Sequence, residues 1–157
     1  RSSDLLAIEK RRLSANKNAE FCELTSMVMI QDDKGNVLVQ EQQNPNGYTL
    51  PTGHIELGES FVQSAIHGVK EKTGLDVDQL KLCGTKQFTS SDGCRHIVFL
   101  YKTNVFNGNK NEESHWISLS KIHDYKLISG LDDVLDVFKE LDCNELYYNA
   151  QYQLKKY

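Results

Sequence analysis

Residues 53–75 read GHIELGESFVQSAIHGVKEKTGL, which indicates a glycine-rich turn followed by a helix. Ser60 is a typical N-cap residue, and Gln63, three residues later, completes a capping box. Gly74 favours the end of the helix, because glycine readily adopts the left-handed conformation found at helix C-termini. We therefore predict a helix over residues 60–73.

The predicted helix has an apolar and a polar side. Phe61, Ala65 and Val69 recur every four residues, which is the spacing of a buried helical face, and Val62 and Ile66 lie beside them. We expect these residues to pack against the rest of the protein. The opposite side carries Ser64, Gly68, Glu71 and Lys72.

Gly68 is an unusual residue for the middle of a helix. Glycine there costs about 0.5–1 kcal/mol relative to alanine. Its presence indicates either a close approach to the helix backbone, for instance by a ligand, or the loss of a side chain that no longer has a function. The sequence leaves both readings open.

The whole stretch resembles the Nudix box, the signature of hydrolases that cleave nucleoside diphosphates linked to another group. That signature is Gly, five residues, Glu, seven residues, then Arg-Glu-apolar-x-Glu-Glu-x-Gly-apolar. The positions that match it in register are Gly53, Glu59, Val69, Glu71, Gly74 and Leu75. The positions that depart from it are His67 in place of Arg, Gly68 in place of Glu, and Lys72 in place of the second Glu of the pair.

These departures fall on the metal-binding positions that the resemblance implies. Carboxylates at i, i+3 and i+4 share one helical face and together can hold hard divalent cations. Here the three positions are Gly68, Glu71 and Lys72. Counting Glu59, four carboxylates become two carboxylates and one ammonium, so the formal charge of the site changes from −4 to −1. We expect the multi-metal site of the family to be lost.

A weaker metal site is still predicted. Magnesium is often held by one or two carboxylates together with substrate phosphates and water. Glu59 and Glu71 are therefore expected to hold one ion weakly, and the resemblance implies the backbone carbonyl of Gly53 as a further ligand. Alternatively, the Lys72 ammonium takes the place of a metal and binds a phosphate as a point charge, without the power to activate water.

Three further residues are site candidates. His67 is expected to orient Glu59, as the family's Arg does, in preference to binding metal, because imidazole is a poor ligand for magnesium. Tyr48 could stack on a base at the pocket mouth or serve as a packing aromatic. The resemblance implies a loop carboxylate that acts on the metals or the attacking water. Glu113 fits that role, with Glu112 in reserve, and a solvated loop acid is the rival interpretation.

The rest of the chain predicts an α/β fold, in which alternating apolar residues on both faces of residues 95–105 favour a sheet covered by helices on both sides. The resemblance implies an α/β/α sandwich with a mixed central sheet over residues 20–157. It does not cover residues 1–19, where cap residues and leucines predict an appended helix or leader with a helix at 2–14. Strands are predicted at 23–31, 37–42, 48–50, 81–88, 95–105 and 115–119, a helix at 131–141, and hairpins about 32–36 and 149–150.

Composition sets limits on location and partners. The chain has 157 residues, a formal charge of −4 and a pI near 5.7, which argues against a nucleic-acid surface held by counterion release. No run is long enough for a membrane span, and no signal-peptide pattern is present. Four cysteines without CxxC spacing are typical of reduced thiols. We expect a cytoplasmic protein of one main domain.

Three functions are compatible with these observations. The first is a weak magnesium-dependent nucleotide pyrophosphohydrolase, similar to the MutT-like group that removes pyrophosphate from 8-oxo-dGTP. The second is a catalytically silent module that binds a nucleotide or a nucleotide-derived small molecule. The third is an interaction protein that uses only the scaffold, because a fold alone does not determine function. A homodimer is compatible with each.

Overall fold

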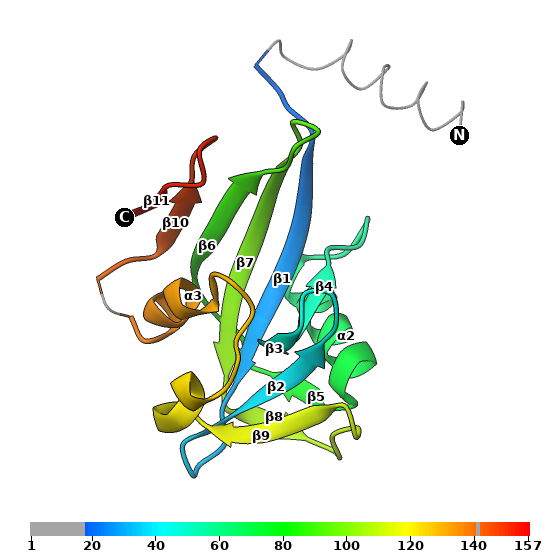
Figure 1. Cartoon of the computed structure of the whole chain (residues 1–157). Helices are drawn as coiled ribbons and strands as arrows, with labels where there is room; N and C mark the ends of the chain where they lie inside the picture. Colours follow the sequence, from blue (N-terminus) through cyan, green and yellow to red (C-terminus); the bar gives the residue numbers. More distant parts are fainter. Residues whose placement is uncertain (1–17, 141) are drawn as a thin grey trace.

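The computed structural model describes residues 18–140 and 142–157, and the predicted N-terminal helix at 2–14 lies outside the described residues. A six-stranded sheet forms the centre of the fold, in the order β11-β10-β6-β7-β1-β4 (Figure 1). Its strands are β1 (Cys22–Ile30), β4 (Thr52–His54), β6 (Lys81–Thr89), β7 (Arg95–Thr103), β10 (Glu145–Tyr148) and β11 (Leu154–Lys156). The β1–β7 and β6–β10 pairs are parallel and the other pairs antiparallel, which confirms the predicted mixed sheet.

Two smaller sheets complete the β-structure. One has the order β3-β2-β9, and the other pairs β5 with β8. Their strands are β2 (Asn36–Gln42), β3 (Gly47–Thr49), β5 (Asp76–Asp78), β8 (Val105–Asn107) and β9 (Ser114–Ser118). Strand β5 is not among the strands predicted from the sequence.

The predicted hairpin of the first two long strands is wrong. Strand β1 pairs with β7 and β4, whereas β2 pairs with β3 and β9, and a single bridge from Gln31 to Val37 connects their ends. Asp32 does shape the expected turn by accepting hydrogen bonds from the backbone N–H groups of Lys34 and Asn36. The five buried residues at the end of β1 nevertheless place that strand inside the central sheet. Tertiary burial therefore decides the pairing.

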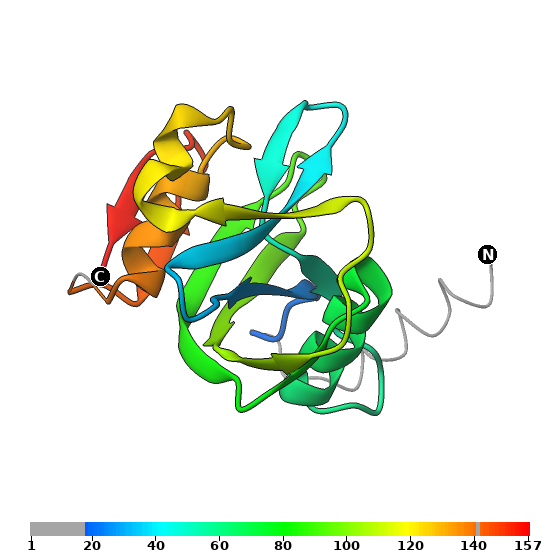
Figure 2. The same cartoon turned by 90° about the horizontal axis from the view of Figure 1, so that it is seen from below.

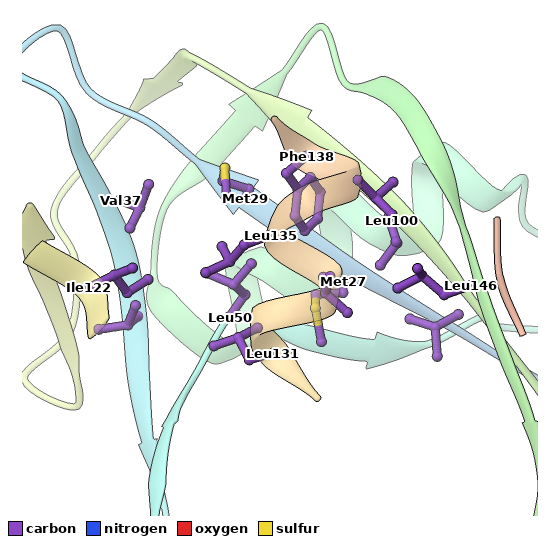
Figure 3. Close-up of a cluster of buried hydrophobic side chains, with 14 of the residues drawn as sticks. Met27, Met29, Val37, Leu50, Leu100, Ile122, Leu131, Leu135, Phe138 and Leu146 are labelled. Carbon is purple, nitrogen blue, oxygen red and sulfur yellow. The ribbon is translucent and has the colours of Figure 1, made fainter. Parts of the chain in front are cut away.

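Helices cover the central sheet on both sides, as predicted. Helix α2 (Phe61–Thr73) and helix α3 (Leu131–Phe138) lie on opposite sides of the strands, while the short 3₁₀ helix η1 (Leu119–Asp124) follows β9 (Figure 2). Successive residues of β1 point to different cores. Met27 and Met29 belong to the cluster that contains residues of α3 (Figure 3), whereas Val28 and Ile30 belong to the cluster that contains residues of α2. None of the described helices has the length and apolar character needed to cross a membrane.

Helix α2 begins and ends where the sequence indicates. Ser60 Oγ accepts a hydrogen bond from the backbone N–H of Gln63 at 3.1 Å, and Gln63 Oε1 accepts one from the backbone N–H of Ser60 at 3.0 Å. Gly74 ends the helix with φ of 84°. The predicted apolar stripe is only partly correct, because the side chains of Phe61 and Val62 are 40% and 39% exposed, whereas Ala65 and Val69 are buried.

Candidate functional site

A pocket of about 340 Å³ lies where helix α2, strand β4 and the central sheet meet. Helix α2 contributes His67, Gly68, Glu71 and Lys72, and β4 contributes Gly53 and its neighbours. The remaining wall comes from side chains of β1, β6 and β7, which lie on the sheet face that also packs against α3. The α2 residues that the sequence singled out are therefore brought together around one cavity.

Glu59 is held at the edge of this region by two side chains of α2. His67 Nδ1 lies 2.6 Å from Glu59 Oε2, and Ser64 Oγ donates a hydrogen bond to Glu59 Oε1 at 3.2 Å. Both oxygens of this carboxylate, whose side chain is 23% exposed, thus have a partner. The expectation that His67 orients Glu59 is confirmed by this contact.

Ser64 is buried, although the sequence placed it on the polar side of α2. Its burial is explained by its hydrogen bonds, because Ser64 Oγ also accepts the backbone N–H of Glu56 at 2.9 Å. This one hydroxyl joins the loop before α2 to the helix and to the Glu59 carboxylate. The sequence gives no signal for such a role.

Replacing Ser64 with alanine is expected to lower the free energy of unfolding by about 1–2 kcal/mol, because the Glu56 N–H and the Glu59 carboxylate each lose a partly buried hydrogen bond. Chemical denaturation of the variant and of the wild type measures this difference. Ser91→Ala is a matched control, since Ser91 is exposed on a loop, and we expect it to change stability by less than about 0.5 kcal/mol. Equal losses in the two variants would contradict the structural role of Ser64.

Gly68 lies opposite Gly53, where the backbones of helix α2 and strand β4 approach each other. A Cβ atom on Gly53 would lie 3.2 Å from Gly68 Cα, which is tighter than ordinary contact, so β4 and α2 pack directly against each other here. A Cβ atom on Gly68 would lie 3.5 Å from Gly53 Cα, an ordinary van der Waals distance. The helix can therefore accept a side chain at position 68, and the missing acid can be restored without a backbone clash.

The described residues form no preassembled cluster of metal ligands at the pocket. Among residues 18–140 and 142–157, no group of three or more His, Cys, Asp or Glu side chains is arranged to hold a metal. Glu71 is exposed at the pocket and makes no hydrogen bond or ion pair with a described residue, so its carboxylate is available. Glu59 and Glu71 are the two acids of the family pattern that remain as candidate ligands for a magnesium ion, whose other ligands would be phosphate oxygens and water.

Lys72 places a positive charge in the same pocket. Its ammonium forms no ion pair within the described part of the chain, and its backbone carbonyl accepts hydrogen bonds from Gln40 Nε2 at 2.5 Å and Asn111 Nδ2 at 2.7 Å. These bonds fix the last turn of α2. The side chain is therefore carried by a fixed backbone and is free to contact an anionic ligand.

Tyr48 and Glu113 lie outside the pocket lining. Tyr48 contacts His115 and Tyr125 edge to face, with ring centroids 6.0 and 5.5 Å apart, and it lines a different cavity beside Lys126. Glu113 is exposed on the loop before β9. Their roles at the site stay predictions.

Three pocket residues were missed by sequence reasoning. Glu56 adds a second carboxylate to the lining beside that of Glu71, and Phe88 and His96 add aromatic rings that stack with centroids 4.8 Å apart and planes 4° from parallel. Phe88 and His96 are cross-strand partners in β6 and β7, so their contact depends on strand register. The period-two alternation of the two strands could have placed them on one face, but it could not have placed that face at the pocket.

Comparison with known families and proteins gives a consistent result. The family model described as the NUDIX domain matches residues 23–138. A dihydroneopterin triphosphate diphosphatase of Escherichia coli K12 is 28% identical over 104 residues, which cover 65% of this chain and 67% of that protein. The uncharacterized Nudix hydrolase YvcI of Bacillus subtilis is 26% identical over 147 residues, which cover 85% and 91% of the two chains.

Solved structures show the same fold at lower identity. The MutT protein of Bacillus halodurans superposes with a TM-score of 0.68 at 17% identity, covering 84% of this chain and 94% of that one. The NUDIX domain of Shewanella oneidensis NrtR, solved as a complex with ADP ribose, gives 0.62 at 16% identity, with 85% and 97% covered.

Proposed function

Because the chain belongs to the Nudix family, we propose that it hydrolyses nucleoside diphosphates linked to another group, and that it does so slowly. The observation that supports this proposal is the environment of the two acids that match the Nudix box, Glu59 and Glu71. Glu59 is held by His67 and Ser64, and Glu71 is open to the pocket. The slow rate follows from Gly68 and Lys72, which occupy acid positions without supplying carboxylates.

The chain's own residues would act on the phosphates in three ways. Glu71 and Glu59, together with the Gly53 carbonyl, would hold one magnesium ion. A bound magnesium ion stabilises negative charge on a phosphoryl group and lowers the pKa of a bound water. His67 and Ser64 keep the Glu59 carboxylate in one orientation, which reduces the entropy lost when a ligand binds. Lys72 would contact phosphate oxygens as a point charge.

Two residues stay in this proposal only as predictions from the family pattern. Glu113 would be the loop carboxylate that acts on the attacking water, and Tyr48 would be the ring that stacks on the base. Phe88 and His96 are better placed to meet a base, since they line the same pocket as Glu71. A substrate with a planar ring at a distance from the phosphates is consistent with this lining.

An activity panel tests the proposal directly. The wild-type protein is incubated with nucleoside triphosphates, including 8-oxo-dGTP, and with dinucleotides and sugar nucleotides, with magnesium or EDTA. Release of pyrophosphate is measured for the triphosphates, and release of a nucleoside monophosphate is measured for every substrate. We expect slow release that requires magnesium and leaves a nucleoside monophosphate. Absence of release from every substrate, with binding retained in a thermal-shift screen, would contradict the proposal.

Lys72 also favours a second function, a nucleotide-binding module without turnover. The domain of NrtR, whose structure was solved with ADP ribose, has the same fold. An ammonium at an acid position can bind phosphate without a metal, but it cannot activate water. In this case the pocket would hold the ligand and leave it intact.

The two functions differ in how nucleotide affinity depends on metal. If the module interpretation holds, affinity is equal in EDTA and in magnesium and falls roughly tenfold or more on Lys72→Glu, because a hydrogen-bonded charge is replaced by a repulsive one. Titration calorimetry measures both. Lys70→Glu is the matched control, since Lys70 lies on the same helix but pairs with Asp76 outside the pocket. Strict magnesium dependence would exclude the module and support the hydrolase.

A further inference from the structure

A second cavity lies on the same face of the central sheet as the pocket beside α2. It measures about 210 Å³ and is lined by Lys86, Phe88, Ser129, Gly130, Tyr148 and Tyr152. Phe88 lines both cavities. We call this second space the Lys86 cavity.

Strand register shows how the two cavities are related. Lys86 of β6 is the cross-strand partner of Val98 in β7 and of Leu146 in β10, and Val98 is the partner of Thr25 in β1. Partners in adjacent strands point to the same face of a sheet. Thr25 and Val98 line the first pocket, so the two cavities follow one another across this face, from the edge at β4 toward β10.

Lys86 is the unusual residue of the second cavity. Its ammonium lies 5.8 Å from the ring centroid of Phe88 and 5.5 Å from that of Tyr148, and it makes no hydrogen bond or ion pair with a residue that the structure describes. A lysine ammonium offers three donors and no acceptor. A half-buried group of this kind is costly to leave without an acceptor.

Asp133, the carboxylate whose charge acts on Lys86, is already engaged by other groups. Asp133 accepts a hydrogen bond from Tyr148 Oη at 3.2 Å and forms an ion pair with Lys156 at 3.3 Å. Burial lowers the pKa of Lys86, and the charge of Asp133 opposes this effect without reversing it. Asp133 therefore orients Tyr148 and leaves the Lys86 donors unused.

Gly130 leaves space in front of these two polar groups. A Cβ atom at this position would lie 3.4 Å from both Lys86 Nζ and Tyr148 Oη. The glycine has a φ of 86°, a conformation that other residues rarely adopt. The chain thus leaves out a side chain at the one point that faces both groups, and a ligand atom can occupy that space.

We propose that the Lys86 cavity binds the part of the substrate remote from the diphosphate, and that Lys86 donates there to an oxygen acceptor of the ligand. This inference rests on the proposed function, in which the pocket beside α2 takes the diphosphate. The acceptor is an oxygen because lysine can only donate. This oxygen acceptor can be a keto oxygen on a nucleobase or a phosphate oxygen on a second nucleoside. The aromatic rings of Phe88 and Tyr148 provide the walls for such a group.

Ligand pairs that differ by the acceptor alone test this inference. Equilibrium titrations with wild-type protein compare ITP with ATP, which differ in a keto or amino group on the base, and NADP⁺ with NAD⁺, which differ in one phosphate. They are run under conditions of negligible turnover. We expect one pair to show a preference of roughly tenfold or more for the oxygen-bearing ligand, as for a hydrogen bond to a charged group. The pair that responds identifies the source of the oxygen.

Variants then assign the preference to Lys86. Lys86→Met should abolish it and Lys86→Arg should retain most of it. Lys81→Met should leave it unchanged, because Lys81 lies on the same strand but outside both cavities and pairs with Glu140. Far-ultraviolet circular dichroism confirms that each variant is folded.

Three results would overturn the inference. It falls if wild type shows no preference in either pair, or if Lys86→Met keeps the preference. In both cases the proposed function stands, provided that wild type binds nucleotides and that Lys72→Glu lowers the affinity for all of them by a similar factor. If no nucleotide binds to wild type at all, the proposed function fails and the inference falls with it.

Discussion

Replacing Gly68 and Lys72 together by glutamate is expected to raise the rate of magnesium-dependent hydrolysis by at least ~100-fold. Substitution of residues that only hydrogen-bond to metal ligands already lowers metal affinity or activity by about 10–100-fold, and the ligands themselves should matter at least as much. The change restores the carboxylates at i, i+3 and i+4 around Glu71, which together can hold divalent cations. The backbone should accept it, because a Cβ atom at position 68 meets Gly53 at an ordinary distance. Phosphate or pyrophosphate release at saturating magnesium measures the gain.

The matched control for this gain is the pair Gly68→Ala and Lys72→Gln. It removes the mid-helix glycine and the ammonium without adding a carboxylate. We expect this variant to be more stable by about 0.5–1 kcal/mol from the alanine but to gain little activity. A wild-type rate comparable with that of the double-glutamate variant would contradict the claim that the missing acids limit turnover.

Replacing Glu71 with glutamine in the double-glutamate background is expected to remove the restored activity, a loss of at least ~100-fold by the same reasoning. Glu71 is the acid that remains from the i, i+3, i+4 set, and it is open to the pocket. Glutamine keeps the shape of the side chain and removes its charge. Steady-state rates across a range of magnesium concentrations separate a weaker metal affinity from a lower maximal rate.

Asp33→Asn is the control for this loss of charge. Asp33 is exposed in the turn between β1 and β2, and its replacement changes the net charge by the same amount. We expect the rate to be unchanged. If Glu71→Gln were as active as this control, Glu71 would have no part in the chemistry.

Features encoded by neighbouring residues could be predicted from the sequence. The limits of α2 follow from Ser60, Gln63 and Gly74, whose hydrogen bonds and backbone conformation are local. The register of the Nudix box is also local, and the contact of His67 with Glu59 follows from it. These predictions needed no knowledge of how the strands pair.

Features that depend on tertiary pairing could not be predicted. The turn after β1 has the chemistry of a hairpin, yet β1 and β2 belong to different sheets. Ser64 looks like a solvent-facing residue by periodicity, but it is buried because the loop before α2 covers it. Lys86 and Gly130 are distant in the sequence and meet only through the packing of α3 on the sheet.

The number of divalent ions that the wild-type pocket binds tests most directly whether Gly68 and Lys72 have removed the multi-metal site of the family. Titration with Mn²⁺, followed by the electron paramagnetic resonance signal of free ion, gives this number with and without a nonhydrolysable nucleotide analogue. We expect at most one bound ion per chain, and only with the analogue present, because Glu59, Glu71 and the Gly53 carbonyl need phosphate oxygens to complete the coordination. Two or three tightly bound ions in the absence of nucleotide would contradict the account.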